Sequence, residues 1–207
     1  MNDKTGNAGP GETARYFNRL YGASNDPYGL RDRWYEERKR ALLLAALTRR
    51  RYASAYEPGC GAAELTADLA LRCDAVLASD FTQRAVDIAA ERTRALPNVR
   101  VERHTLAQDW PDATFDLIVL SEVGYFLDDE ALHGVVAACD RTLAPGGTLV
   151  ACHWLPDFDE RRQSTEVVHM ALNGLGLPRT VVHREDDFLM QLWCRDPASV
   201  AQAEGIR

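Results

Sequence analysis

An alternation of strand-like and helix-like segments, which begins near residue 50, constrains the fold of this chain more than any other feature. Within it, Leu117–Leu120 is a short, continuous apolar run, as expected for a strand buried on both faces of a sheet. Segments with apolar residues at helical spacing separate the strand-like segments from one another. Because parallel strands need such crossover helices, the alternation predicts an α/β fold with a doubly wound, mostly parallel sheet.

The predicted sheet has seven strands, and the last two form an antiparallel hairpin around the acidic turn at residues 185–187. The strands are expected at residues 52–57, 74–80, 98–104, 115–121, 148–154, 179–184 and 188–195. The helices are expected at residues 12–20, 32–47, 64–71, 82–96, 128–143 and 160–175, with a turn at Pro145-Gly146-Gly147. These elements predict a disordered tail at residues 1–12, a helical segment at residues 13–50 and a sheet domain at residues 51–207.

Composition narrows the range of partners. The 207 residues suffice for one domain with a sizeable core, and 24 basic against 31 acidic residues give a net charge of −7. Nucleic-acid binders usually present a basic surface, so this balance argues against one. No apolar run approaches the ~20 residues of a membrane span, and the polar N-terminus lacks the apolar stretch of a secretory signal. Five cysteines without CxxC spacing indicate reduced thiols in a cytoplasmic protein, rather than disulfides or a metal site.

The loop after the first strand holds two glycines, Gly59 and Gly61, on either side of Cys60. In an open α/β sheet, ligands bind at the carboxyl ends of the strands, where glycines let the backbone approach a ligand closely. A phosphate-binding GxGxxG loop would have its third glycine at position 64, but that residue is Glu64. Together with Glu57 before the loop, this carboxylate favours a cationic ligand that has no phosphate groups.

The ends of the second and third strands supply further candidates for a nucleoside site. Asp80 lies nineteen residues beyond Gly61, a position from which a carboxylate accepts hydrogen bonds from ribose hydroxyls. The alternative role for Asp80 is to cap the helix that follows. Phe81 could pack on a base, and Thr105 and Leu106 could offer backbone groups and an apolar wall to an adenine edge.

The ends of the fourth and fifth strands carry the candidates for chemistry. Ser121 and Glu122 follow the buried fourth strand, and an unpaired buried carboxylate is very costly, so Glu122 is expected at the rim or beside a cation. His153 suits a general base at neutral pH, and Glu122 is its rival as base or as anchor for a substrate ammonium. Tyr125 and Trp154 are expected to shape the acceptor pocket. Weaker candidates for the base are His104, His169 and His183.

These features together are the pattern of a class I, Rossmann-like methyltransferase that uses S-adenosylmethionine (SAM). The sulfonium and ammonium groups of SAM are cationic, and its nucleoside carries no phosphate. Methyl transfer is an in-line displacement from sulfur, so the protein mainly aligns a nucleophile that has a free lone pair. The alternatives are a nicotinamide-dependent oxidoreductase, a nucleic-acid methyltransferase and a SAM-binding protein without turnover. Glu64 argues against the first and the acidic charge against the second.

Several segments make the chain similar to the nodulation protein S (NodS) family of class I methyltransferases, over about residues 16–155. They are Asp26-Pro27-Tyr28, Trp34-Tyr35-Glu36, Arg38-Lys39, Tyr56–Cys60, Asp109-Trp110-Pro111, Phe115–Phe126 and Leu143–Trp154. The first three lie outside the general SAM-binding fold, which makes the resemblance more specific than the loop glycines alone. The family's named member methylates the free amine of a deacetylated chitin-oligosaccharide precursor.

The resemblance implies a cofactor site at the carboxyl ends of the strands and a lid over it, formed by residues 13–50. The residues that would line the cofactor site are Glu57, Gly59, Cys60, Gly61, Asp80, Phe81, Thr105, Leu106 and Ser121. The residues that would reach it from the lid are Tyr28, Trp34, Tyr35 and Arg38. Among these, Arg38 is the expected partner of the cofactor carboxylate.

The predicted function is SAM-dependent methyl transfer to a small molecule. The resemblance favours an amine, such as that of an amino sugar, over a hydroxyl, and O-methylation is the alternative. No metal, nucleic acid or membrane is expected to take part, and the oligomeric state is left open.

Overall fold

The computed structural model describes residues 10–106 and 108–207, which form a seven-stranded sheet in the order β3-β2-β1-β4-β5-β7-β6. The strands are β1 (Tyr52–Pro58), β2 (Cys73–Asp80), β3 (Val99–Arg103), β4 (Phe115–Ser121), β5 (Leu143–Trp154), β6 (Arg179–Arg184) and β7 (Phe188–Cys194). Neighbours are parallel from β3 to β5, and β7 runs antiparallel to both β5 and β6. The sequence-based prediction of a mostly parallel sheet with an antiparallel C-terminal hairpin is confirmed.

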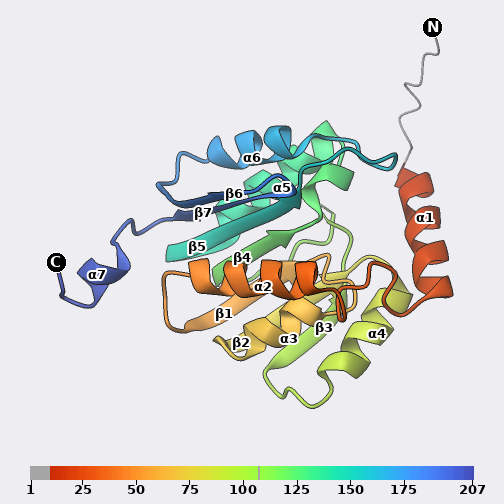
Figure 1. Ribbon diagram of the computed structural model, residues 1–207, viewed down its shortest axis with the longest axis horizontal. Coiled ribbons are helices and arrows are strands. Elements are labelled where there is room, and N and C mark those ends of the chain that lie inside the picture. Colours follow the sequence, from red (N-terminus) through yellow and green to blue (C-terminus); the bar gives the residue numbers. More distant parts are fainter. Residues whose placement is uncertain (1–9, 107) are drawn as a thin grey trace, which may run out of the picture.

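Helices cover both faces of the sheet (Figure 1). One face carries α2 (Trp34–Ala46), α3 (Glu64–Ala70) and α4 (Gln83–Thr93), and the other carries α5 (Asp129–Thr142) and α6 (Thr165–Asn173). A 3-10 turn, η1 (Gly124–Phe126), follows β4, and a short helix, α7 (Val200–Ala203), lies near the C-terminus. Helix α1 (Pro10–Ala23) stands apart, at one end of the sheet (Figure 1).

Strand β4 joins the two halves of the core. Leu117 and Val119 belong to the apolar cluster under α2 and α3, whereas Ile118 and Leu120 belong to the cluster under α5 and α6. All four side chains are at most 2% exposed. Because full burial of such a side chain stabilises the fold by roughly 1.5–3 kcal/mol, this strand fixes the centre of the sheet, as its apolar run predicts.

Side-chain caps set the beginnings of α4, α5 and α6. The Thr82 hydroxyl accepts from Ala85 N–H before α4, and the Asp128 carboxylate accepts from Ala131 N–H before α5. The prediction that a helix begins at residue 160 is wrong. Ser164 caps α6, and the guanidinium of Arg161 donates to the carbonyl oxygen of Leu155, which holds the preceding segment in a loop.

Two other predicted boundaries differ from the structure. Pro145-Gly146-Gly147 does not precede β5 but lies inside it as a bulge, since pairing with β4 steps from Phe115–Leu143 to Leu117–Thr148. Helix α1 begins at Pro10, so residues 10–12 are not part of a tail. The rest of the expected tail, residues 1–9, lies outside the described residues.

The five cysteines are buried free thiols, as the sequence predicts. Among the described residues, no helix combines the length and apolar character that crossing a membrane requires.

Candidate active site

The loop between β1 and α3 passes through the left-handed backbone region at Gly59 (φ +72°) and Gly61 (φ +53°). A Cβ atom on Gly59 would lie 2.2 Å from Cγ1 of Val123, and one on Gly61 would lie 2.6 Å from the Tyr21 hydroxyl oxygen. The loop is therefore in close contact with the turn after β4 on one side and with α1 on the other. Neither contact leaves room for a side chain.

Asp80, at the end of β2, holds this loop. One carboxylate oxygen, Oδ2, accepts from Gly61 N–H at 3.3 Å, and the other, Oδ1, accepts from the backbone N–H and the hydroxyl of Thr82 at 2.9 and 3.1 Å. Burial raises the pKa of Asp80, and these hydrogen bonds oppose the rise. The helix cap is Thr82, not Asp80. A carboxylate has about four acceptor positions, so Oδ2 keeps capacity for a further donor.

The two glutamates expected to give the loop a negative rim do not do so. Burial raises the pKa of Glu57 to about 8, against the hydrogen bond that it accepts from the Thr66 hydroxyl at 2.6 Å, so Glu57 is largely neutral at pH 7. Burial would also raise the pKa of Glu64, but Arg92 and Arg31 outweigh it and lower that pKa. Both guanidinium groups lie within 3.0 Å of the Glu64 carboxylate. The argument from these acids to a cationic ligand is therefore wrong.

Cys60, between the two glycines, is buried and its N–H donates to the carbonyl oxygen of Ser79 at 2.9 Å. Burial raises the pKa of its thiol well above the usual value, so the thiol stays protonated. Cys60 therefore stabilises the loop through its backbone hydrogen bond and not through its thiol.

Helix α1 covers the same loop with aromatic side chains that the sequence analysis did not single out. Phe17 meets Phe81 edge-on at 5.5 Å and Phe126 at 5.0 Å between ring centroids. Tyr21 is 4% exposed and packs with Ala62. A helix with aromatic residues four positions apart presents them on one face, which is the signal that could have identified this pair.

The end of β3 contributes less than expected. Thr105 is exposed, and its backbone N–H donates to the Asp109 carboxylate at 3.0 Å, so it is occupied within its own loop. Leu106 is partly buried against the apolar cluster under α5. The Thr105 carbonyl oxygen accepts from Gln108 N–H at 3.1 Å and from Asp109 N–H at 2.9 Å, so the predicted backbone contact requires a rearranged loop.

Glu122, directly after Ser121 at the end of β4, is the centre of a hydrogen-bond network. Its backbone is left-handed, with φ +58°, which is uncommon for a residue with a side chain. Its carboxylate accepts from the Tyr125 hydroxyl, from Trp154 N–H at 2.9 Å and from the Lys39 ammonium at 2.7 Å. Of the two placements expected for Glu122, at the rim or beside a cation, the structure has it beside a cation. Tyr125 and Trp154, expected to shape the acceptor pocket, both bind the Glu122 carboxylate.

Lys39, on α2, is the residue that the sequence analysis missed here. Its side chain is 7% exposed, and its ammonium lies 3.0 Å from Glu36 and 5.1 Å from the centre of the Tyr35 ring. Burial would lower the pKa of Lys39, but Glu122 and Glu36 outweigh it and raise that pKa, so the ammonium stays charged. The two positions Arg38 and Lys39 are about 100° apart on a helix, and only a model of the packing distinguishes which one faces inward.

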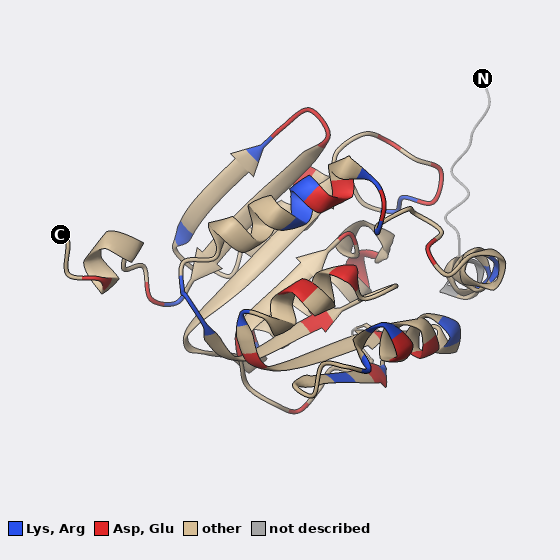
Figure 2. Ribbon diagram, turned by 60° about the horizontal axis from the view of Figure 1, so that its bottom comes forward, with Lys and Arg blue, Asp and Glu red and all other residues tan. Residues whose placement is uncertain are grey.

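The residues expected to form the lid separate into two groups. Trp34 is 69% exposed, and Arg38 binds Glu185 of the β6–β7 turn with two hydrogen bonds of 2.8 Å. Figure 2 shows this acidic turn in red at the end of the β6–β7 hairpin. Tyr35 meets Trp154 edge-on at 5.6 Å. Tyr28 and Tyr35 bury hydroxyl groups that have no hydrogen-bond partner within the described part of the chain.

The surroundings of His153 argue against its predicted role as a general base. Its side chain is fully buried, and its Nε2 accepts from Gly124 N–H at 3.0 Å, so the lone pair that a base needs is occupied. Burial, with His169 and two nearby cations, lowers the pKa of His153 well below its usual value. Of the weaker candidates, His169 is also buried, while His104 and His183 contact Glu102 and Glu185 on the sheet surface.

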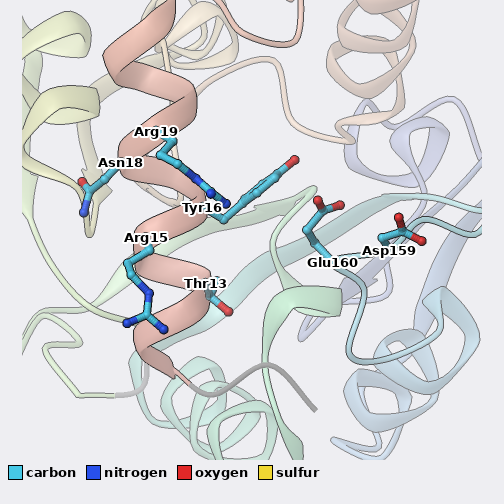
Figure 3. Close-up of a pocket in the computed structure, with 7 residues that line it drawn as sticks. All are labelled: Thr13, Arg15, Tyr16, Asn18, Arg19, Asp159 and Glu160. Atoms are coloured by element: carbon cyan, nitrogen blue, oxygen red, sulfur yellow. The ribbon is translucent and has the colours of Figure 1, made fainter. Parts of the chain in front are cut away.

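A cavity of about 750 Å³ lies between α1 and the loop after β5 (Figure 3). It is lined by Thr13, Arg15, Tyr16, Asn18, Arg19, Asp159 and Glu160. Tyr16 points from α1 toward Glu160 on the opposite wall. Phe158, next to Asp159 in that loop, meets the Tyr125 ring edge-on at 5.0 Å between ring centroids.

Comparison with known proteins agrees with this architecture. Residues 55–147 match the family model of a methyltransferase domain. Nodulation protein S of Rhizobium tropici is 34% identical over 130 residues, which are 62% of this chain and 55% of that protein. The chain spans 55–62% of the length of the curated relatives that it matches.

Two crystal structures extend the comparison. A Pseudomonas syringae protein assigned to the methyltransferases is 44% identical, with a TM-score of 0.72, over 79% of this chain and all of that one. The N-methyltransferase NodS of Bradyrhizobium japonicum, bound to S-adenosylhomocysteine (SAH), is 26% identical with a TM-score of 0.79, over 88% and 97% of the two chains. By its fold and by these matches, the chain belongs to the class I methyltransferase family and is similar to the NodS proteins.

Proposed function

We propose that this protein transfers the methyl group of SAM to a small-molecule acceptor, with an amine favoured over a hydroxyl. The observation that carries the proposal is the junction of Asp80, the Gly59–Gly61 loop and the Glu122 network at one edge of the sheet. The Bradyrhizobium japonicum N-methyltransferase, which binds SAH and shares the fold, supports both the cofactor and the preference for nitrogen.

On the cofactor side, we assign the ribose to Asp80, because Oδ2 keeps a free acceptor position beside the Gly61 N–H. Phe81 and Leu106 would flank the base, and the Gly59–Gly61 backbone with Ser121 would face the amino-acid part. When bound, SAM supplies an electrophilic methyl group on a sulfonium, and the chain needs only to bind and orient it. We assign the role of the lid to Phe17 and Tyr21 of α1 instead of Trp34 and Arg38.

On the acceptor side, Glu122 and Tyr125 present a carboxylate and a hydroxyl that are already oriented by Lys39 and Trp154. An amine attacks only as the neutral base, so a group that accepts a proton or a hydrogen bond from it must lie close by. Glu122 can do this, and His153 cannot. We assign the entry of the acceptor to the cavity between α1 and the loop after β5, which has the size of ordinary ligand pockets. Its wall residue Asp159 follows Phe158, which meets the Tyr125 ring.

Methylation of oxygen and binding of SAM without turnover are the competing proposals. A hydroxyl acceptor needs a base more than an amine does, and the described residues at this edge offer Glu122 for it. The Burkholderia thailandensis O-methyltransferase family protein, at 13% identity and a TM-score of 0.72, shares the fold only. Sequence similarity therefore supports the amine.

Isothermal titration with SAM and SAH tests the cofactor, and mass spectrometry tests the reaction. We expect both ligands to bind, and a product heavier by one methylene group from a defined pool of amino sugars, amines and phenols. Binding of SAM and SAH without any product from this pool would favour the alternative that the protein binds SAM without turnover. Correctly folded protein that binds neither ligand would refute the proposal.

A further inference from the structure

A chain of hydrogen bonds runs behind the turn that follows β4, and the proposed reaction does not use it. Gly124 N–H donates to His153 Nε2 at 3.0 Å, His153 Nδ1 lies 3.1 Å from His169 Nε2, and His169 Nδ1 lies 2.9 Å from Gln191 Oε1. The two histidines are 0% and 3% exposed and come from β5 and α6. Three elements of the sheet and its cover are thus connected to one backbone N–H.

Only one arrangement of protons satisfies all three contacts. A backbone N–H can only donate, so His153 Nε2 must be unprotonated and its proton must lie on Nδ1. That proton is then donated to His169 Nε2, which places the proton of His169 on Nδ1, where it is donated to the Gln191 carbonyl oxygen. Both rings are therefore neutral, and a further proton on either Nε2 would break one of the bonds.

The surroundings favour this neutral state. Burial lowers the pKa of His169 to about 4, against the Gln191 hydrogen bond and the nearby carboxylates of Glu166 and Glu122, which raise it. The charges that face His153 are the cations Lys39 and Arg161, and the Tyr125 ring lies 5.3 Å from its ring. A proton on His153 would be buried next to these cations.

The bond to Gly124 acts on the whole turn from Glu122 to Tyr125. Glu122 is left-handed and binds back to β5 through its N–H and the Cys152 carbonyl oxygen at 2.9 Å. Gly124 has no room to move toward α6, because a Cβ there would lie 2.4 Å from Val168. Between them, Val123 touches the Gly59 position of the cofactor loop. A displaced turn would therefore move the Glu122 carboxylate and loosen the contact with the cofactor loop together.

We propose that His153 and His169 are positioning residues, a permanently neutral pair that fixes the Glu122–Tyr125 turn by accepting the Gly124 N–H. They take no proton from the acceptor. The activity assay below rests on the proposed function, whereas the binding and spectroscopic measurements concern the pair itself.

Two variants of His153 distinguish three roles for this residue: positioning the turn, acting as a general base, and filling space in the core. In His153→Gln, the amide can offer an oxygen to Gly124 N–H and an N–H to His169, and it does not titrate. In His153→Leu, the ring volume is largely kept but the acceptor is lost. His133→Gln on the exposed surface of α5 is the matched control, since His133 bonds only within its own helix.

We expect the glutamine variant to keep SAH affinity and kcat/KM within about threefold of the parent at pH 7.5, as the control does. The leucine variant should lose about tenfold in both, in the folded fraction, because one buried donor is left unsatisfied and the turn relaxes. Equal losses of kcat/KM in both variants, with SAH binding intact, would mean that His153 is a base. Unchanged binding and activity in folded leucine variant would mean a purely structural role. Either result overturns the proposal.

Nitrogen-15 NMR of the histidines provides the second measurement, and it needs no acceptor. We expect His153 and His169 to be protonated on Nδ1 and not to titrate near pH 6.5. A proton on Nε2 of His153 at neutral pH would refute the pair. A parent that binds no SAH would instead refute the proposed function, while this spectrum still decides the state of the pair.

Discussion

The cofactor half of the site, built on β1 and β2, and the acceptor half, built on β4 and β5, achieve order by different means. In the first half, backbone geometry does most of the work, with Gly59, Gly61 and Asp80 close in sequence. In the second half, side chains from distant elements converge, as with Lys39 of α2 on Glu122 after β4. A site made of backbone is sensitive to added atoms, whereas a site made of side chains is sensitive to lost partners.

The sharpest test of this contrast adds a single methyl group to the cofactor loop. Gly59→Ala places a Cβ 2.2 Å from Val123 and strains a backbone with φ +72°, so SAH affinity should fall at least a hundredfold, of which the strain accounts for roughly 1–2 kcal/mol. Gly176→Ala is the control, because Gly176 has φ +67° and nothing within 4 Å of its Cβ position. Titration calorimetry on both measures the difference. Equal affinities would show that the loop is not packed as described.

The second change removes the carboxylate that links the loop to β2. Asp80→Ala should weaken SAH binding by about ten- to a hundredfold, because hydrogen bonds to a charged group are worth about 1.5–3 kcal/mol. Asp74→Ala, at the exposed opposite end of the same strand, should leave the dissociation constant unchanged. An unaltered dissociation constant for SAH in Asp80→Ala would mean that Asp80 only supports the Thr82 cap.

The third change breaks the acceptor half and should spare the cofactor half. Lys39→Met keeps the length of the side chain but leaves the Glu122 carboxylate without its cation, so kcat/KM should fall about tenfold with SAH affinity within about threefold. Arg38→Gln, one position earlier on α2, should change neither, because Arg38 pairs with Glu185 in solvent. The double variant Lys39→Met/Glu122→Gln should recover part of the stability lost in Lys39→Met, which a double-mutant cycle of unfolding free energies measures. Loss of SAH binding in Lys39→Met would show that the halves are not separable.

The last change concerns the buried acid next to the cofactor loop, and it is measured on stability rather than on ligand binding. The folded state holds a proton on Glu57 up to about pH 8, whereas the unfolded chain loses it near pH 4.5. The unfolding free energy should therefore fall as the pH rises between these values, by at most about 1.4 kcal/mol per unit. Glu57→Gln should lose this dependence and gain stability over the parent at pH 7.5 relative to pH 5. Denaturant titrations at both pH values, with Glu130→Gln as an exposed control, decide it. If the unfolding free energies of the parent and Glu57→Gln change equally with pH, Glu57 is exposed to water in the folded protein.

The sequence predicted most of what depends on local pattern. The apolar run of β4, the hairpin turn and the position of Gly59, Gly61 and Asp80 follow from spacing and residue type, and each lies where it was expected. The boundary errors arose where a cap or a bulge competes with periodicity, as at Ser164 and at Gly146.

What depends on the packing of distant segments could not be predicted. The sequence alone suggests that Glu64 is a free acid, but in the fold Arg31 and Arg92 bind it. It also suggests that His153 is a base, but in the fold both ring nitrogens are hydrogen-bonded, to Gly124 and His169. Neighbouring positions on one helix, such as Arg38 and Lys39, differ only in which of them the rest of the fold covers. Roles assigned from residue type therefore agree best with the structure where the contact is made by the backbone rather than by side chains.

The burial of all five sulfhydryl groups has a practical consequence. Alkylating reagents attack thiolates, and burial raises the pKa of Cys60, Cys73, Cys139 and Cys152. Each modification thus requires the protein to open, and the five sites lie in or beside β1, β2, α5, β5 and β7. The order in which the five cysteines of the native protein are labelled therefore shows which part of the fold opens first.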